Sequence, residues 1–323
     1  MKVLVTGAGA VLGQGIIRSL RESGLGATIV AADPSPLSAG LYWTESRHLL
    51  PMARDPGFVA RVEELLAAER PDAIIPGTDV ELHHFAVHRA AWEARFGTRV
   101  IVSSPEVIQI ADDKWLTNQF LRDRGFAVPE SCLAGDEAAL AARVGFPLIV
   151  KPRVGARSVG VVKVHDHAAL ARAVAEGDNV VIQECVATDA DEYTAGALVF
   201  GGRCHASIVM RRDLRDGNTY RAYVQPYPEL DAQVRRMAEA LAPHGPANFQ
   251  FRVGSDGQAK VFEINGRFSG TTPFRMRAGF NEVEMTLRHL VLGEPVTQPA
   301  ITPMTILRHF EETVVRDGEL VTR

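Results

Sequence analysis

The sequence lacks the features that mark several large classes of protein. Cysteine is scarce, and Cys132, Cys185 and Cys204 are odd in number and widely spaced, which indicates neither a disulfide framework nor a CxxC zinc site. Basic residues are not in excess, because 35 Lys and Arg stand against 39 Asp and Glu for a net charge of −4. No apolar run approaches the roughly 18 residues of a membrane span, and the N-terminus shows no signal-peptide pattern. These absences predict a soluble, cytoplasmic protein that binds neither nucleic acid nor membranes.

The order of apolar and turn residues divides the 323-residue chain into two kinds of structure. In residues 1–105, strand patterns alternate with amphipathic helix patterns, which predicts a parallel α/β sheet. The expected strands there are 3–5, 28–32, 73–75 and 100–102, and the expected helices are 12–22 and 58–69. Later residues predict a mixed α+β region with helices 105–110, 115–124, 166–176 and 229–241, and strands 146–151, 160–164, 179–185, 192–200 and 203–210.

A glycine-rich turn, with Gly7, Gly9 and Gly13, follows the first expected strand. Backbone N–H groups at such a turn can bind a phosphate, and Asp33 ends the next strand where a ribose-binding acid would lie. An NAD(P)-dependent reductase or epimerase is therefore one hypothesis. The spacing departs from GxGxxG, however, and none of the five tyrosines has Lys four residues on, the pair that such enzymes use for proton transfer. A purely structural role for the glycines is the favoured interpretation.

The segment 248–267 predicts a β-hairpin with polar side chains along one face. Asp256-Gly257 lies between two alternating strands and is typical of a two-residue type I′ turn. Such a turn pairs Ser255 with Gln258, Gln250 with Glu263, and Asn248 with Asn265. The period of two then assigns the opposite face to Phe249, Phe251, Phe262 and Ile264.

This polar face has the composition of a magnesium site. Carboxylate and amide oxygens are the ligands that Mg²⁺ takes beside a nucleotide, and Arg267 follows directly as a cation for a phosphate. We therefore predict metal binding by Gln250, Glu263 and Asn265. A solvated strand face is the alternative interpretation.

Together with these residues, an ordered set of motifs resembles the ATP-grasp superfamily, in particular short proteins similar to the large chain of carbamoyl-phosphate synthetase and to the amino-acid ligase of pyrrolysine biosynthesis. The motifs are Asp112-Asp113-Lys114, Pro147-Leu-Ile-Val-Lys151-Pro, a glycine loop, Gln183-Glu184, Glu192-Tyr193 and Phe262-Glu263-Ile-Asn265-Gly-Arg267. The resemblance implies a Rossmann-like (pre-ATP-grasp) domain at 1–105, followed by a two-part ATP-grasp domain. Its small subdomain would span 106–183 and its C-terminal subdomain 184–323.

The resemblance also implies a role for each matching residue. Lys114 and Lys151 would hold the ATP phosphates, and the loop with Arg157, Ser158 and Gly160 would close over them. Main-chain groups of Glu184 and Val186 would bind adenine, and Glu192 would bind the ribose. One or two Mg²⁺ ions, with Mn²⁺ as an alternative, would lie at the metal face, and Arg267 would stabilise the transferred phosphoryl group, with Lys151 beside it.

The implied reaction joins a carboxylate to an amine through an acyl phosphate, with a homodimer as a family-level expectation. Candidate substrate residues are Arg212, Thr219 and Arg275 for a carboxylate, and Asp79 and Glu81 for an ammonium group. Ordinary surface charge is the alternative for both sets. A non-catalytic ATP sensor also remains open, since binding residues alone do not prove turnover.

Overall fold

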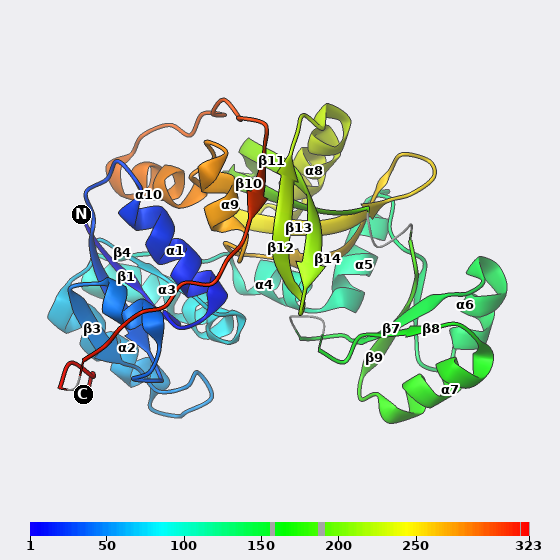
Figure 1. The fold of residues 1–323 in the computed structure, drawn as a ribbon, viewed down its shortest axis with the longest axis horizontal. Coiled ribbons are helices and arrows are strands. Elements are labelled where there is room, and N and C mark those ends of the chain that lie inside the picture. Colours follow the sequence, from blue (N-terminus) through cyan, green and yellow to red (C-terminus); the bar gives the residue numbers. More distant parts are fainter. Residues whose placement is uncertain (156–158, 187–190, 317, 323) are drawn as a thin grey trace.

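Three sheets in a row form the molecule, seen in Figure 1 with the N-terminal sheet on the left and the smallest sheet on the right. The computed structural model describes residues 1–155, 159–186, 191–316 and 318–322. The predicted loop residues Arg157 and Ser158 therefore lie outside the described residues. No helix within the described ranges is long and apolar enough to cross a membrane.

The N-terminal sheet is parallel, with the strand order β3-β2-β1-β4-β5. Its strands are β1 (Lys2–Val5), β2 (Thr28–Asp33), β3 (Ser46–Leu49), β4 (Ala73–Ile75) and β5 (Arg99–Val100). Its helices are α1 (Val11–Arg21), α2 (Phe58–Glu69) and α3 (Leu82–Phe96), with short 3-10 turns η1 (Ala39–Trp43) and η2 (Asp79–Glu81). The inner strands β1, β2 and β4 are mainly apolar because helices cover both faces, and their parallel pairing confirms the predicted parallel α/β arrangement.

The smallest sheet is antiparallel, with the order β6-β9-β7-β8. Its elements are β6 (Ser131–Leu133), α6 (Glu137–Val144), β7 (Leu148–Pro152), β8 (Val162–Val164), α7 (His167–Glu176) and β9 (Val180–Glu184). The Asp166 side chain caps α7 by accepting a hydrogen bond from the Ala169 N–H at 2.7 Å.

The large central sheet is antiparallel and has the order β14-β13-β10-β11-β12-β15. Its strands are β10 (Glu192–Phe200), β11 (Arg203–Arg215), β12 (Asn218–Val224), β13 (Gly245–Val253), β14 (Ala259–Asn265) and β15 (Met304–Leu307). Helices α4 (Pro105–Asp112), α5 (Lys114–Asp123) and α8 (Pro228–Leu241) pack with this sheet around Phe249 and Phe251. The helices at 105–123 thus share the core of the central sheet, although the sequence division grouped them with the small subdomain.

The C-terminal part of the chain returns to the N-terminal sheet. Helices α9 (Thr272–Arg277) and α10 (Glu282–Leu292) contact α1, and Val283 and Leu287 join the core beneath β1. After β15 the chain crosses back toward β3, as the red trace in Figure 1 shows. There Trp43 Nε1 donates to Thr313 Oγ1 at 2.8 Å. The N-terminal unit is therefore fixed to the central sheet by packing and by this returning segment.

The β13–β14 hairpin differs from the prediction near its turn. Gln250 pairs with Glu263 and Asn248 pairs with Asn265, as predicted, but the register then shifts so that Phe251 pairs with Val261. The turn is closed by the Gly254 N–H donating to the Gln258 carbonyl, so the predicted pairing of Ser255 with Gln258 is wrong. The bulge removes Phe262 from the buried face and turns it to the polar side of the hairpin.

Candidate functional site

A cavity of about 820 Å³ extends across one face of the central sheet, from the small sheet to the N-terminal unit. Strands β7, β9, β13 and β14 contribute Lys151, Gln183, Gln250 and Glu263 to its lining. The N-terminal unit closes the other end with residues 9–12 and 77–80. Side chains far apart in the sequence therefore meet in one space, as expected for a ligand site.

Two lysines lie at the end of the cavity near the small sheet. Lys151 is 5% exposed, and its Nζ donates to Gln183 Oε1 at 2.8 Å and to the Phe262 carbonyl at 3.3 Å. Burial lowers the pKa of Lys151 to about 7, although Glu263 acts in the opposite direction. Lys114 begins α5 after the Asp113 N-cap, and its Nζ donates to the Gly155 carbonyl at 2.8 Å. Neither ammonium group forms an ion pair within the described ranges, so both are available to an anionic ligand.

The polar face of the hairpin is assembled as the sequence predicted. Gln250 Nε2 donates to Glu263 Oε1 at 2.9 Å and to Asn265 Oδ1 at 3.1 Å, and Asn265 Nδ2 donates to Glu263 Oε1 at 3.1 Å. Gln250 Oε1 accepts from Arg212 Nη2 at 2.5 Å, so Gln250 presents its amide nitrogen to the other two residues. Glu263 and Asn265 supply hard oxygen donors side by side, which fits Mg²⁺ or Mn²⁺.

Arg267 lines the cavity next to these ligands and is held by the N-terminal unit. Its Nε and Nη2 donate to the two carboxylate oxygens of Asp79 at 2.7 and 2.8 Å. Burial works to lower the pKa of Arg267, but Asp79 and then Glu263 outweigh it, so the pKa lies above its usual value. The predicted ammonium site at Asp79 is therefore occupied by Arg267, and the pair joins the N-terminal unit to the central sheet.

Comparison with known proteins finds sequences similar to this chain. A family model described as ATP-grasp in the biosynthetic pathway with Ter operon matches residues 179–313. The carbamoyl phosphate synthase large chain of Gemmatimonas aurantiaca is 27% identical over 335 aligned residues, which cover 93% of this chain and 29% of that protein. Residues 179–313 thus match an ATP-grasp family model, and the longer alignment relates the chain to carbamoyl phosphate synthase large chains. It spans less than a third of the length of the curated relatives that it matches.

Solved structures show the same fold at low sequence identity. N5-carboxyaminoimidazole synthetase from Staphylococcus aureus, complexed with ADP, aligns with a TM-score of 0.74 at 16% identity, over 95% of this chain and 81% of that one. L-amino acid ligase from Bacillus licheniformis aligns with a TM-score of 0.70 at 19% identity, over 90% and 74% of the two chains. The α/β architecture with one parallel and two antiparallel sheets is thus that of ATP-grasp structures.

The predicted adenine and ribose residues lie along the β9–β10 edge of the cavity. Glu184 and Val186 both line it, and the Glu184 carboxylate pairs with Lys260 at 3.0 Å. Glu192 also lines it, but one of its oxygens accepts from Arg212 at 2.7 Å and the other from Arg252 at 3.0 Å. Gly160, in the phosphate loop, has a φ of +73°, a conformation that favours glycine. The two arginines hold the Glu192 carboxylate in a fixed orientation on the cavity wall.

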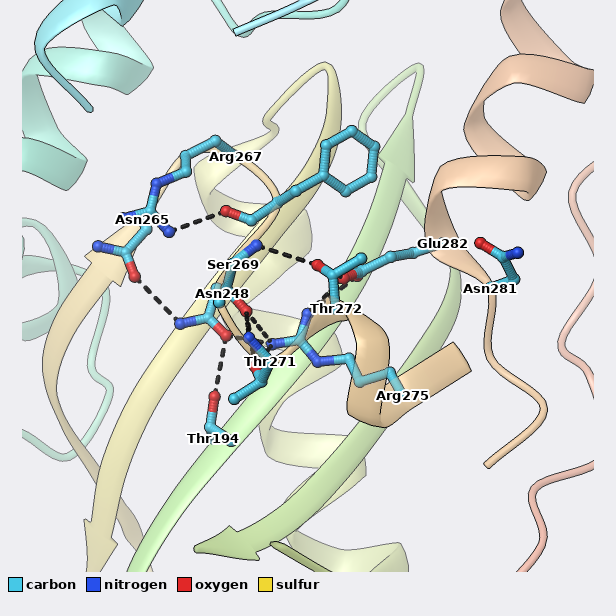
Figure 2. A network of polar contacts seen from close by, with 12 residues as sticks. Thr194, Asn248, Asn265, Arg267, Ser269, Thr271, Thr272, Arg275, Asn281 and Glu282 are labelled. Carbon is cyan, nitrogen blue, oxygen red and sulfur yellow. Dashed lines mark hydrogen bonds and ion pairs between the residues drawn. The ribbon is translucent and has the colours of Figure 1, made fainter. Parts of the chain in front are cut away.

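A buried network of polar contacts supports the polar face of the hairpin from behind (Figure 2). Arg275 is fully buried, pairs with Glu282 at 2.8 Å, and donates through Nη2 to Asn248 Oδ1. Asn248 in turn donates to Asn265 Oδ1 at 3.0 Å. Arg275 does not line the cavity, so the structure places it behind the site and not at the predicted substrate position. It orients the amides that face the cavity.

The other predicted substrate residues divide in the same way. Arg212 and Thr219 line the cavity, and Thr219 Oγ1 accepts from Arg212 Nη1 at 3.4 Å. Glu81 does not line the cavity, because it is buried beneath the glycine turn and accepts from Thr6 Oγ1 at 3.0 Å. Burial raises the pKa of Glu81 to about 7. Glu81 follows strand β4, as predicted, but its side chain points into the protein and not into the cavity.

The glycine turn of the N-terminal unit is shaped by close packing. A Cβ atom at Gly13 would lie 2.2 Å from the Gly7 carbonyl oxygen, and one at Gly9 would lie 2.2 Å from Ser38 Oγ. The Asp33 carboxylate accepts from the Gly9 N–H at 2.7 Å and from Ser38 Oγ at 2.6 Å. The acid expected to bind a ribose thus has its oxygens engaged within the protein. These contacts favour the structural interpretation of the glycines over the NAD(P) hypothesis.

Sequence reasoning missed several cavity residues, including Phe262, Arg252 and Arg308. Phe262 reaches the cavity through the bulge, and its ring centroid lies 5.2 Å from Lys151 Nζ. Arg308 follows the edge strand β15, far along the chain from any motif. Phe262 and Arg308 carry no local sequence signal. A bulge brings Phe262 to the cavity, and the long-range pairing of β12 with β15 brings Arg308 there.

Proposed function

We propose that this protein is an ATP- and Mg²⁺-dependent carboxylate–amine ligase that forms an amide through an acyl phosphate. The observation that carries the proposal is the convergence of Lys114, Lys151, Glu263, Asn265 and Arg267 on one cavity. This set combines cations for a triphosphate, oxygen ligands for a metal, and an arginine beside them. The N-terminal unit is inferred to be the Rossmann-like partner domain of the ATP-grasp domain, since its residues close the far end of the cavity.

The residues have distinct roles in this proposal. Lys114 and Lys151 neutralise ATP phosphates, with Gly160 and its loop above them, while the backbone of Glu184 and Val186 receives the adenine and Glu192 the ribose. Glu263 and Asn265 hold the metal, and Gln250 orients both through its amide nitrogen. When bound, Mg²⁺ offsets the negative charge of the phosphate oxygens. Arg267, positioned by Asp79, stabilises the phosphoryl group as it moves to the substrate carboxylate.

A cavity lined by residues of both antiparallel sheets and of the N-terminal unit suits the proposed intermediate. An acyl phosphate hydrolyses in water, so walls that limit its contact with solvent favour its survival until an amine displaces phosphate and forms the amide. The acid and the amine are inferred to enter at the end of the cavity that the N-terminal unit lines, beyond the pair of Asp79 and Arg267. A homodimer is proposed on family grounds.

The test is ATP-dependent phosphate release in the presence of Mg²⁺ with pools of amino acids, small carboxylic acids and amines. Release that needs both an acid and an amine, with a condensed product found by mass spectrometry, is the expected result. ATP binding without release from any pool would favour a nucleotide sensor. Absence of ATP binding would overturn the proposal.

A further inference from the structure

The described cations that line the cavity fall into two groups. Arg212, Arg252 and Arg267 pair with carboxylates of the protein. Lys114, Lys151 and Arg308 form no ion pair with any residue for which the structure gives a position. Lys114 and Lys151 contact Gly155 and Gln183 at the phosphate end. Among the cavity cations that the structure describes, Arg308 is therefore the one that has no ion pair and no role in the proposed ATP chemistry.

Arg308 lies at the opposite, N-terminal end of the cavity. Its backbone N–H donates to the Tyr220 carbonyl at 2.9 Å, which extends the β12–β15 pairing by one residue. Its Nη2 donates to the Gly270 carbonyl, and its guanidinium carbon lies 4.8 Å from the centroid of the Phe274 ring. These contacts fix the guanidinium group while leaving donors free, because arginine has five N–H groups in a planar fork.

The surroundings of Arg308 leave its charge uncompensated. Burial, and then the nearby Arg18, lower the pKa of Arg308 to about 10, so the group remains a cation at neutral pH. Gly270 packs against the start of α1, because a Cβ atom at Gly270 would lie 3.2 Å from Val11 Cγ1. The described contacts of the Arg308 guanidinium are thus the Gly270 carbonyl and the Phe274 ring, and no carboxylate is among them. An anion entering here would meet a pre-positioned cation without displacing a protein carboxylate.

We propose that Arg308, beside Gly270 and the start of α1, is the subsite that binds a carboxylate group of the substrate. That the bound carboxylate belongs to a substrate rests on the proposed function. The anion-binding site itself rests on the geometry of the cavity. A planar carboxylate fits the guanidinium fork with two parallel hydrogen bonds. The subsite selects small acids or amino acids, and it rejects their neutral amides because these leave the arginine charge unpaired.

The experiment measures carboxylate binding directly, so that it does not depend on turnover. Thermal unfolding is followed with saturating ADP and increasing acetate, glycine, L-alanine, L-glutamate or succinate, with acetamide and succinamide as neutral controls. In the wild type, at least one carboxylate should raise the midpoint saturably, and the amides should not. Arg308→Gln should weaken the apparent affinity by about 10- to 100-fold, the range expected for charge-assisted hydrogen bonds.

Two further variants separate the subsite from general charge effects. Arg308→Lys keeps the charge but loses the planar fork, and should recover part of the affinity. Arg18→Gln removes an equal charge nearby from a residue that does not line the cavity and stacks on Trp43, and should leave the affinity within about twofold. No stabilisation by any carboxylate in the wild type, or equal affinity in the wild type and Arg308→Gln, would overturn the subsite.

Phosphate release measured on the same samples distinguishes this inference from the ligase proposal. Carboxylate binding that depends on Arg308, without phosphate release from any pool, would keep the subsite and count against the ligase. Phosphate release whose KM for the acid and for the amine is unchanged in Arg308→Gln would keep the ligase and overturn the subsite. Where one KM rises about 10- to 100-fold while the KM for ATP is unchanged, the affected substrate is the one that Arg308 binds.

Discussion

The glycine turn of the N-terminal unit and the β13–β14 hairpin carry the two strongest motifs of the sequence, and they use polar groups in opposite ways. At the glycine turn, the Asp33 carboxylate is satisfied by Gly9 and Ser38. At the hairpin, Glu263 and Asn265 contact neighbouring amides and still line the cavity. A motif thus indicates chemistry only where its polar atoms remain accessible to a ligand after folding.

The largest expected effect tests the hairpin. Glu263→Gln should lower Mg²⁺-dependent phosphate release by about 10³-fold, because a neutral amide replaces the charged oxygen ligand of the metal. The fold should persist, since this side chain faces the cavity and not the core. Glu64→Gln, at an exposed position of α2, is the matched control and should retain full activity. Near-normal release by Glu263→Gln would remove the metal assignment.

The second prediction tests the glycine turn. Gly13→Ala should lower the free energy of unfolding by about 3 kcal/mol, because its Cβ would meet the Gly7 carbonyl oxygen at 2.2 Å and the backbone must move. Chemical denaturation measures this change. Gly57→Ala, where the added Cβ would meet only Asp55 Oδ1 at 3.2 Å, is the control. Thermal stabilisation of the wild type by NAD⁺ or NADP⁺ would contradict the structural interpretation of this turn.

A smaller effect is expected at the phosphate end. Lys151→Ala should weaken ATP binding by about 10- to 100-fold, measured by calorimetry, through loss of a point charge on the phosphates. Stability without ATP should be maintained, because burying the ammonium group already disfavours its charged form. Lys163→Ala, at an exposed position of β8 in the same sheet, serves as control. Equal nucleotide affinity in both variants would show that the phosphate loop is placed wrongly.

The smallest effect concerns Glu81, beneath the glycine turn. Its pKa is raised from 4.5 to about 7 in the folded protein, so the folded state favours the protonated carboxyl group. The resulting contribution to the free energy of unfolding is fully present below about pH 4.5 and is lost as the pH rises through 7. Glu81→Gln should therefore gain roughly 1–3 kcal/mol in unfolding free energy at pH 8 relative to the wild type, and less at pH 5. Denaturant titrations at both pH values measure the difference. Phosphate release should be unchanged, and a pH-independent effect would contradict the burial of this carboxyl group.

Local patterns predicted most of the elements around the site. The expected helix 58–69 matches α2, and the expected strand 192–200 matches β10 in full. The face shared by Gln250, Glu263 and Asn265 was also predicted, because residue period and strand pairing are local properties. The prediction failed where one extra residue enters a strand, as at Phe262, since a bulge is not encoded by the turn sequence alone.

The ATP-grasp family model matches residues 179–313, yet this similarity does not distinguish a residue in the cavity from one behind it. Arg267 and Arg275 both follow β14 and both pair with a carboxylate. The first lines the cavity, while the second is fully buried and holds Asn248. This difference is set by where the chain places α9 (Thr272–Arg277), which carries Arg275 into a buried position.

The resemblance to the ATP-grasp superfamily singled out Lys114 and Lys151, whereas the sequence patterns by themselves determined the alternating α/β and α+β regions and the polar face of the hairpin. These depend on periodicity and on short spacings, which a chain keeps in any packing arrangement. Only the tertiary structure decided that Asp79 would hold Arg267 and that Arg308 would close the far end of the cavity. Those contacts join residues 188 positions apart or lie at the end of an edge strand, and they exist only once three sheets have packed together.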